Sequence, residues 1–295
     1  MSDWYYMNVV LIQTTLTTLL LALSIQVPLR FGVFSFAGVG AFGVGGYGAA
    51  MAMVHLEWST WPAVAIGALA AATAVLVLGL VVRRLTGLYM GMATIAFTLI
   101  VSVVAVNGGD ATGGAGGLYG ALGEISMQQI LLVVAGVVAV LVWTEARGLG
   151  RRIDTVREDP ELANALGIDV NGYRLMSFAV SGLIGGLAGA ITTLLRSTIT
   201  PAEVNFHLVI VALTAIVVGG ARSWLGALIG AVIFVWLPTW LSFVQEWEKV
   251  AYGFIVAAAA IYLPNGVLGV LKDALHRFRT REERARVALL QQEKG

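Results

Sequence analysis

Residues 61–82 read WPAVAIGALAAATAVLVLGLVV, a stretch without any charged side chain and rich in alanine, valine and leucine. A helix of this length is long enough to cross the roughly 30 Å hydrocarbon core of a bilayer. Similar apolar runs recur along the chain of 295 residues, of which 58% are hydrophobic and only 12% are charged. A soluble domain typically has about a quarter of its residues charged. The sequence therefore predicts an all-α polytopic membrane protein, with residues 1–295 forming a single transmembrane domain.

We expect about nine membrane-spanning helices, within a range of about eight to ten. The expected spans are residues 7–27, 33–54, 61–82, 88–106, 128–145, 174–195, 205–220, 223–244 and 250–271. With the N-terminus outside, sixteen of the 18 lysines and arginines lie on the cytoplasmic side, and only Arg196 and Lys249 lie outside. Because positive charge favours the cytoplasmic side of the membrane, the predicted orientation is N-terminus out and C-terminus in. Residues 147–174 and the tail, residues 272–295, are then cytoplasmic.

The sequence lacks the residues that several kinds of chemistry require. The chain has no cysteine and only three scattered histidines, so we expect neither a metal site nor thiolate chemistry. It also lacks the G-x-x-x-x-G-K-[ST] phosphate loop, so ATP hydrolysis would require another subunit. The predicted spans have essentially no ionisable residue at their centres, whereas proton- and sodium-coupled carriers usually need one. This composition favours a path for small neutral or zwitterionic solutes, with no cofactor and no nucleic acid bound by the chain.

The 36 glycines of the chain are concentrated in a few spans. Gly182 and Gly186 in the sixth span, and Gly226 and Gly230 in the eighth, have the small-xxx-small spacing that lets helices approach closely. The second span is denser in glycine than close packing requires. Two interpretations are therefore open for it: tight helix packing, or a broken helix that lines a pore.

Residues 107–120 read NGGDATGGAGGLYG and follow the fourth predicted span on its outer side. Such glycine-rich backbone either forms a flexible outer loop or lines a cavity at membrane depth, where its amides and carbonyls can hold a small solute. Hydroxyl groups within the spans are further candidates, although they are often bonded to their own helix. The candidate residues for a translocation path are Ser35, Gly38, Thr94, Asn107, Thr112, Gly113 and Gly114.

The polar loop, residues 147–174, is the main charged segment between two spans. Within it, Asp159 is placed to cap a helix, Pro160 suits the first helical position, and Gly167 suits the left-handed position that ends a helix. Leu162, Ala163 and Leu166 are expected to share one face. A two-turn helix has little stability of its own, so this face is expected to dock, either on the protein's own helix ends or on a partner.

The polar loop and its surroundings resemble a known family. Residues 161–167 read ELANALG and resemble the E-A-A-x-x-x-G signature of ATP-binding-cassette (ABC) importer permeases, with leucine in place of the first alanine. Further matches are VRED at 156–159, GLY at 87–89, ATIAF at 93–97, TGG at 112–114 and GLAGA at 186–190. Over about residues 20–271 the chain resembles the branched-chain amino-acid permeases, and in particular their LivM-like subunits. The second span lacks a histidine that many members have, and similar permeases serve urea and short amides.

The resemblance implies that the polar loop contains a coupling helix, which inserts into a cleft of a cytoplasmic ATPase. The residues that it assigns to this contact are Arg157, Glu158, Asp159, Glu161, Leu162, Ala163, Leu166 and Gly167. It also implies assembly in the cytoplasmic membrane with a homologous permease subunit, with two ATP-binding subunits that hold ATP and Mg²⁺, and with an extracytoplasmic substrate-binding protein.

Two other functions are open from the residues alone. A secondary transporter or facilitative channel would work without an ATPase, but it would leave the docking helix without a purpose. An intramembrane enzyme would need a cluster of ionisable groups near one interface, whereas the acidic residues here are dispersed over several loops or concentrated in the polar loop.

Overall fold

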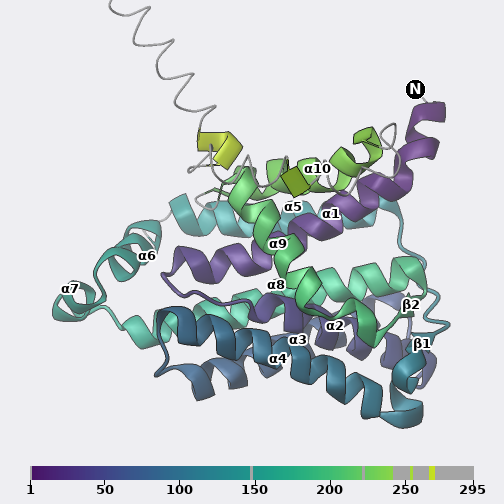
Figure 1. The fold of residues 1–295 in the computed structure, drawn as a ribbon, viewed down its shortest axis with the longest axis horizontal. Coiled ribbons are helices and arrows are strands. Elements are labelled where there is room, and N and C mark those ends of the chain that lie inside the picture. The colour runs from purple at the N-terminus through teal and green to yellow at the C-terminus, as the bar shows by residue number, and fades with distance from the viewer. Residues whose placement is uncertain (1, 147–148, 221–222, 242–252, 255–265, 270–295) are drawn as a thin grey trace, which may run out of the picture.

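The computed structural model describes residues 2–146, 149–220, 223–241, 253–254 and 266–269, and nearly all of these are helical (Figure 1). The longer helices are α1 (Ser2–Arg30), α2 (Ala37–Val54), α3 (Thr60–Val82), α4 (Gly87–Asn107), α5 (Met127–Ala146), α6 (Leu149–Glu158), α8 (Val170–Arg196), α9 (Phe206–Gly219) and α10 (Trp224–Leu241). Short elements are the helix α7 (Pro160–Ala165), the 3-10 turns η1 (Gly109–Ala111), η2 (Gly114–Gly116) and η3 (Pro201–Glu203), and the strands β1 (Leu118–Tyr119) and β2 (Thr198–Ile199).

The first eight predicted spans each coincide with a helix of the structure. Six helices are individually long and apolar enough to cross a membrane, namely α1 to α5 and α8. The helices α9 and α10 pass that test only as a pair, and they are bent by 119° at the break between them. The ninth predicted span, residues 250–271, lies mostly outside the described residues. The structure is therefore that of an all-α protein with several apolar spans, and the number nine stays a prediction.

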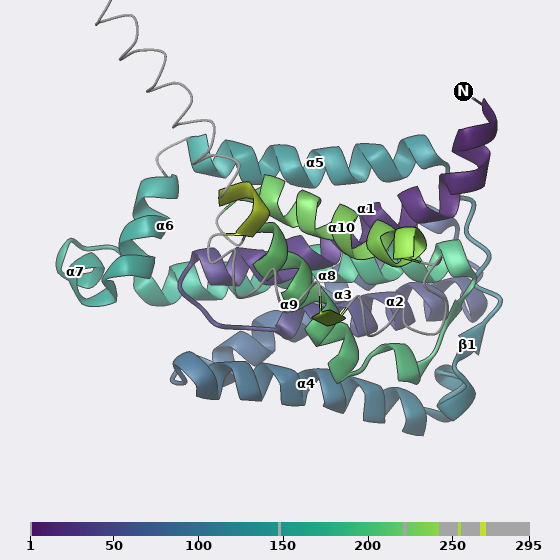
Figure 2. The ribbon, with the colours of Figure 1, turned by 45° about the horizontal axis from the view of Figure 1, so that its top comes forward.

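The helix α2 lies inside the bundle and packs against both α3 and α8, which also contact each other (Figure 2). Its glycines permit this position, because a Cβ atom on Gly45 would collide with the backbone of Gly186 in α8. At its contact with α3, a Cβ on Gly48 would lie 3.1 Å from the Cα of Gly67. The helix is continuous from Ala37 to Val54. Of the two interpretations of the second span, the structure thus supports close packing, without a break inside the helix.

The non-helical backbone lies just before α2. The predicted span begins at residue 33, but residues 31–36 form a connection that turns back from the end of α1. Here the Val33 N–H donates to the carbonyl of Pro28 at 2.9 Å, and Gly32 has a φ of +74°. The Gly32 N–H also donates to the carbonyl of Leu29 at 3.2 Å, and these two bonds around a glycine with positive φ form a C-terminal helix cap. This cap accounts for the end of α1 before the expected second span begins.

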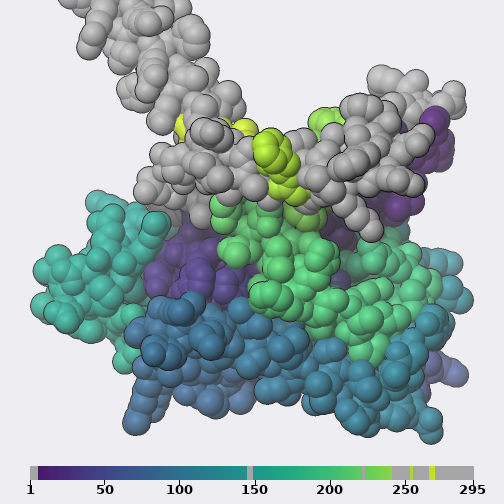
Figure 3. All heavy atoms as spheres, viewed as in Figure 1, coloured from purple at the N-terminus to yellow at the C-terminus, as the bar shows by residue number. Residues whose placement is uncertain are grey.

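The two ends of the bundle differ in character. The polar loop, which includes α6 and α7, projects from one end as a separate knob (Figure 3). At the opposite end, β1 and β2 form a two-stranded antiparallel ribbon that pairs Leu118 with Ile199 (Figure 1). This ribbon ties the glycine-rich segment after α4 to the segment after α8, so the two ends carry the two polar regions that the sequence singled out.

Candidate functional site

The helix α7 has the local structure that its sequence predicts. The Oδ1 atom of Asp159 accepts hydrogen bonds from the N–H groups of Glu161 and Leu162, at 3.0 and 2.9 Å. At the other end, Gly167 has a φ of +78° and the Ile168 N–H donates to the carbonyl of Ala163 at 3.0 Å. These bonds satisfy end groups that a short helix would otherwise leave unpaired.

The apolar residues of α7 do not act as one face. Ala163 has no exposed surface and packs with Val156 of α6 and Val170 of α8. Leu162 and Leu166 are 51% and 66% exposed. Helical spacing places positions 162, 163 and 166 within an arc of about 100°. The structure divides this face: Ala163 docks on the protein's own helices and holds α7 against α6 and α8, and the two leucines remain on the surface of the knob.

The knob is connected to the membrane helices at two further points. A Cβ on Gly32, just after α1, would lie 3.1 Å from the Cα of Arg157, so the backbones are in close contact there. The ring of Phe31 lies 6.3 Å from that of Tyr173 near the start of α8, measured between centroids. Deeper in the bundle, the Ser181 hydroxyl of α8 donates to the carbonyl of Ser24 in α1 at 2.6 Å. A displacement of α7 would therefore reach both α1 and α8.

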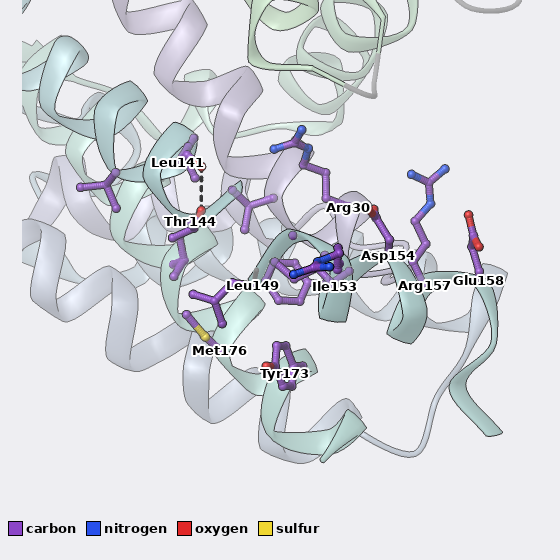
Figure 4. A pocket seen from close by; sticks show the side chains of 16 residues that line it. Arg30, Leu141, Thr144, Leu149, Ile153, Asp154, Arg157, Glu158, Tyr173 and Met176 are labelled. Carbon is purple, nitrogen blue, oxygen red and sulfur yellow. Dashed lines mark hydrogen bonds between the residues drawn. The ribbon is translucent and has the colours of Figure 1, made fainter. Parts of the chain in front are cut away.

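An inner cavity of about 690 Å³ lies between α1, α5, α6 and α8, beside the knob. Figure 4 shows apolar side chains, among them Leu141 and Met176, on one side and the charged Asp154, Arg157 and Glu158 on the other. The cavity thus has an apolar side formed by α5 and α8 and a charged side formed by α6. Two residues assigned to the coupling contact, Arg157 and Glu158, line this cavity as well as lying next to α7.

Three of the predicted path residues gather at the start of α2. The Thr94 Oγ1 accepts a hydrogen bond from the Phe36 N–H at 3.0 Å, and the Ser35 Oγ accepts one from the Ala37 N–H at 3.2 Å. A Cβ on Gly38 would collide with Ser24 of α1. All three residues are fully buried or occupied by backbone contacts, so each has a structural role that needs no solute.

The other four predicted path residues lie at the far end of α4. The Thr112 hydroxyl donates to the carbonyl of Ala105 at 2.7 Å, and the Asn107 amide donates to the carbonyl of Val103 at 2.8 Å. Gly113 and Gly114 have positive φ values of 73° and 60° in an ordered turn. The structure therefore divides the seven candidates between two places, and none of them lines the inner cavity or a second, smaller cavity at the other end of the bundle. Their role in a path stays a prediction.

An outer cavity of about 270 Å³ was not predicted from the sequence. It lies at the end away from the knob and is lined by Thr14, Thr17, Thr18 and Leu21 of α1, Phe42 of α2, Thr192 and Arg196 of α8, Ala202 and Glu203 of η3, Asn205, and His207 and Leu208 of α9. Burial raises the pKa of Glu203 above the usual value of a glutamate, and nearby Arg196 partly opposes this increase. The sequence signal that could have indicated this cavity was Arg196, one of the two cations that the predicted orientation places outside.

Replacing Asp159 with alanine is expected to loosen α7. The substitution removes the acceptor of two N–H groups, and loss of a capping residue costs about 1 kcal/mol, which corresponds to roughly a fivefold faster exchange of protected amides. Hydrogen–deuterium exchange over residues 160–166 measures this change. Asp159→Asn keeps an acceptor and should exchange like the wild type, as should Asp154→Ala, which removes an exposed carboxylate from α6. Equal exchange in all three variants would contradict the capping role.

Comparison with known proteins agrees with the earlier resemblance. Residues 7–263 match the family model described as "Branched-chain amino acid transport system / permease component". The high-affinity branched-chain amino acid transport system permease protein LivM of Escherichia coli is 23% identical, over 88% of this chain and 70% of its own length. A probable branched-chain amino acid transport permease protein LivH of Methanocaldococcus jannaschii is 29% identical, over 50% of this chain and 48% of its own. No solved structure matches this chain.

Proposed function

The chain belongs to the branched-chain amino acid transport permease family, and from this premise we propose that it is the membrane-spanning subunit of an ABC importer. Its solute would be a branched-chain amino acid or a similar small neutral or zwitterionic molecule, such as urea or a short amide. It would work in the cytoplasmic membrane with a homologous permease subunit, two cytoplasmic ATP-binding subunits and an extracytoplasmic substrate-binding protein. ATP and Mg²⁺ would bind to the partner ATPases and not to this chain.

One observation carries this proposal: Leu162 of α7 and Leu166, which directly follows it, are both exposed although the ends of this helix are already satisfied. The helix does not need Leu162 and Leu166 for its own packing, because Ala163 supplies the internal contact. Apolar side chains at positions i and i+4 of a short helix are the usual anchors for insertion into a groove on another protein. A cleft on an ATPase subunit is such a groove.

The packing around α7 supports a mechanism for the coupling. Closure of the ATPase dimer would push α7 toward the membrane. Because Ala163 is packed against Val156 and Val170, the push would move α6 and the start of α8 together. The contact between Arg157 and Gly32 would pass it to α1. Rigid-body rocking of α1, α5 and α8 would then open the path to alternate sides of the membrane, as in other transporters that move packed helices.

The proposed orientation places the knob in the cytoplasm. With the N-terminus outside, sixteen of 18 lysines and arginines are cytoplasmic, as the distribution of positive charge in membrane proteins favours. The polar loop and the β1–β2 ribbon lie at opposite ends of the bundle (Figure 1), which is compatible with one cytoplasmic and one external face.

Reconstitution tests the proposed function directly. Proteoliposomes that contain this chain, its partner permease and the two ATPase subunits should accumulate leucine against a gradient when ATP and binding protein are supplied. The same vesicles without the ATPase subunits should show no accumulation and no fast equilibration of leucine. Equilibration in vesicles that contain this chain alone would instead support a facilitative channel and would overturn the importer assignment.

A further inference from the structure

The outer cavity brings together segments that are far apart in the sequence. Side chains from α1, α2, the end of α8, η3 and the start of α9 all line it. Its volume, about 270 Å³, is near the lower end of the range for ligand-binding pockets. A site of this size suits a solute of amino-acid dimensions and excludes a large one.

The cavity contains one group of each charge. Arg196 is exposed at the C-terminal end of α8, and Glu203 is half-buried in η3. The two groups are close enough for Arg196 to affect the pKa of Glu203, yet no ion pair within 4.0 Å joins them in the described part of the chain. A cation and an anion that share a small cavity without neutralising each other can each bind an opposite charge on a ligand.

The remaining lining is divided between hydroxyl and apolar groups. The hydroxyls of Thr17 and Thr192 donate to backbone carbonyls of their own helices, at 3.2 and 2.7 Å. Their oxygen lone pairs can still accept a hydrogen bond from a ligand ammonium. Phe42 and Leu208 offer apolar surface in the same cavity. This combination matches a solute with charged groups at one end and an aliphatic side chain at the other.

A buried hydroxyl near Glu203 adds a second sign of a functional region. Tyr47 of α2 is only 4% exposed, and its hydroxyl has no hydrogen-bond partner among the described residues. It interacts electrostatically with Glu203. Unpaired buried hydroxyls are rare and unfavourable in folded proteins. Tyr47 does not itself line the cavity, but its hydroxyl shows that polar groups in this part of the protein are not all paired among the described residues.

The geometry points to the outer cavity as a subsite that receives a small zwitterion, with Glu203 binding its ammonium group and Arg196 binding its carboxylate. The inference rests on the proposed function and deepens it, because it assigns to this chain a direct contact with the solute. It also narrows the solute class: urea and short amides carry no pair of opposite charges, whereas a free amino acid does.

Thiol protection tests this subsite without requiring ATP hydrolysis. The wild-type chain contains no cysteine, so Thr14→Cys introduces a single thiol into the lining, with Thr18→Cys as the alternative if the first variant folds poorly. The complete complex in membranes is treated with a membrane-impermeant thiol reagent, and labelling of this chain is followed by gel electrophoresis. Saturating leucine should slow the labelling about tenfold. Leucinamide, which lacks the carboxylate, and 4-methylpentanoate, which lacks the ammonium, should protect at least about tenfold less well.

Charge-removing variants complete the test. Glu203→Gln or Arg196→Gln in the single-cysteine chain should raise the leucine concentration needed for protection about tenfold or more. Glu124→Gln, which removes an exposed carboxylate that does not line the cavity, should leave protection unchanged, and Leu122→Cys should be labelled without any protection. Equal protection by leucine and leucinamide, or no protection at all, overturns the subsite. ATP-driven uptake that persists in that case leaves the importer assignment intact, so the two failures are distinguishable.

Discussion

Replacing both Leu162 and Leu166 with glutamate is expected to abolish ATP-driven uptake while leaving the protein folded in the membrane. The two side chains are 51% and 66% exposed and lie outside the small core around Ala163, so the substitutions leave that core intact. If the leucines anchor α7 in an ATPase cleft, each charge would be buried there without a partner. Loss of one such interface anchor typically costs at least about 2 kcal/mol, or roughly thirtyfold in affinity. Uptake in proteoliposomes and co-purification of the ATPase subunits measure the effect.

A matched control distinguishes the loss of the docking contact from the general effect of an added negative charge. Asn164→Glu adds a carboxylate to another exposed position of the same helix, about 200° around the helix axis from Leu162. It should assemble with the ATPases far better than the double variant. Wild-type uptake by the variant with both leucines replaced would exclude these residues as the coupling contact. Equal loss of uptake in the Asn164 control would mean that the knob is sensitive to any added negative charge.

The sequence predicts those features that local signals determine. The span of residues 61–82 and the helix Thr60–Val82 differ by one residue, because a long apolar run has few alternatives in a membrane. The helix α7 was predicted from Asp159, Pro160 and Gly167, each of which acts on backbone groups within three residues. Where interactions between residues close in sequence determine a feature, the residue types alone were sufficient to predict it.

Features that depend on tertiary contacts could not be predicted in this way. The burial of Ala163 results from Val156 and Val170, and helical spacing within α7 does not contain that information. The buried Thr94 binds the Phe36 N–H from 58 positions away in the sequence, so its hydroxyl was interpreted as a path group and not as part of a helix connection. The outer cavity draws on five segments between Thr14 and Leu208, and only the folded chain brings them together.

Replacing Gly189 with alanine is expected to destabilise the bundle, because α2 and α8 are in backbone contact at this position. A Cβ on Gly189 would collide with the carbonyl of Phe42 and would lie 2.9 Å from its Cα. Backbone atoms of a packed helix cannot move aside as a flexible side chain can. Overpacking by one methyl group typically costs about 1–3 kcal/mol, which corresponds to a Tm lower by roughly 2–10 °C in a domain of this size. Gly189→Val should be worse and is expected to prevent accumulation of folded protein.

Gly136 in α5 provides the control for this prediction, since a Cβ there meets no heavy atom within 4 Å. Alanine at this exposed helical position should leave the Tm unchanged or raise it, because alanine favours the helix by up to about 1 kcal/mol over glycine. Thermal unfolding of the purified variants, followed by tryptophan fluorescence and gel filtration, compares the two sites. The expected changes in Tm differ in direction between Gly189→Ala and Gly136→Ala. This difference is informative, because a general preference of helices for alanine would raise both Tm values. A Gly189→Ala variant as stable as Gly136→Ala would show that α2 and α8 lie further apart than described, and the packing of α2 inside the bundle would then have to be revised.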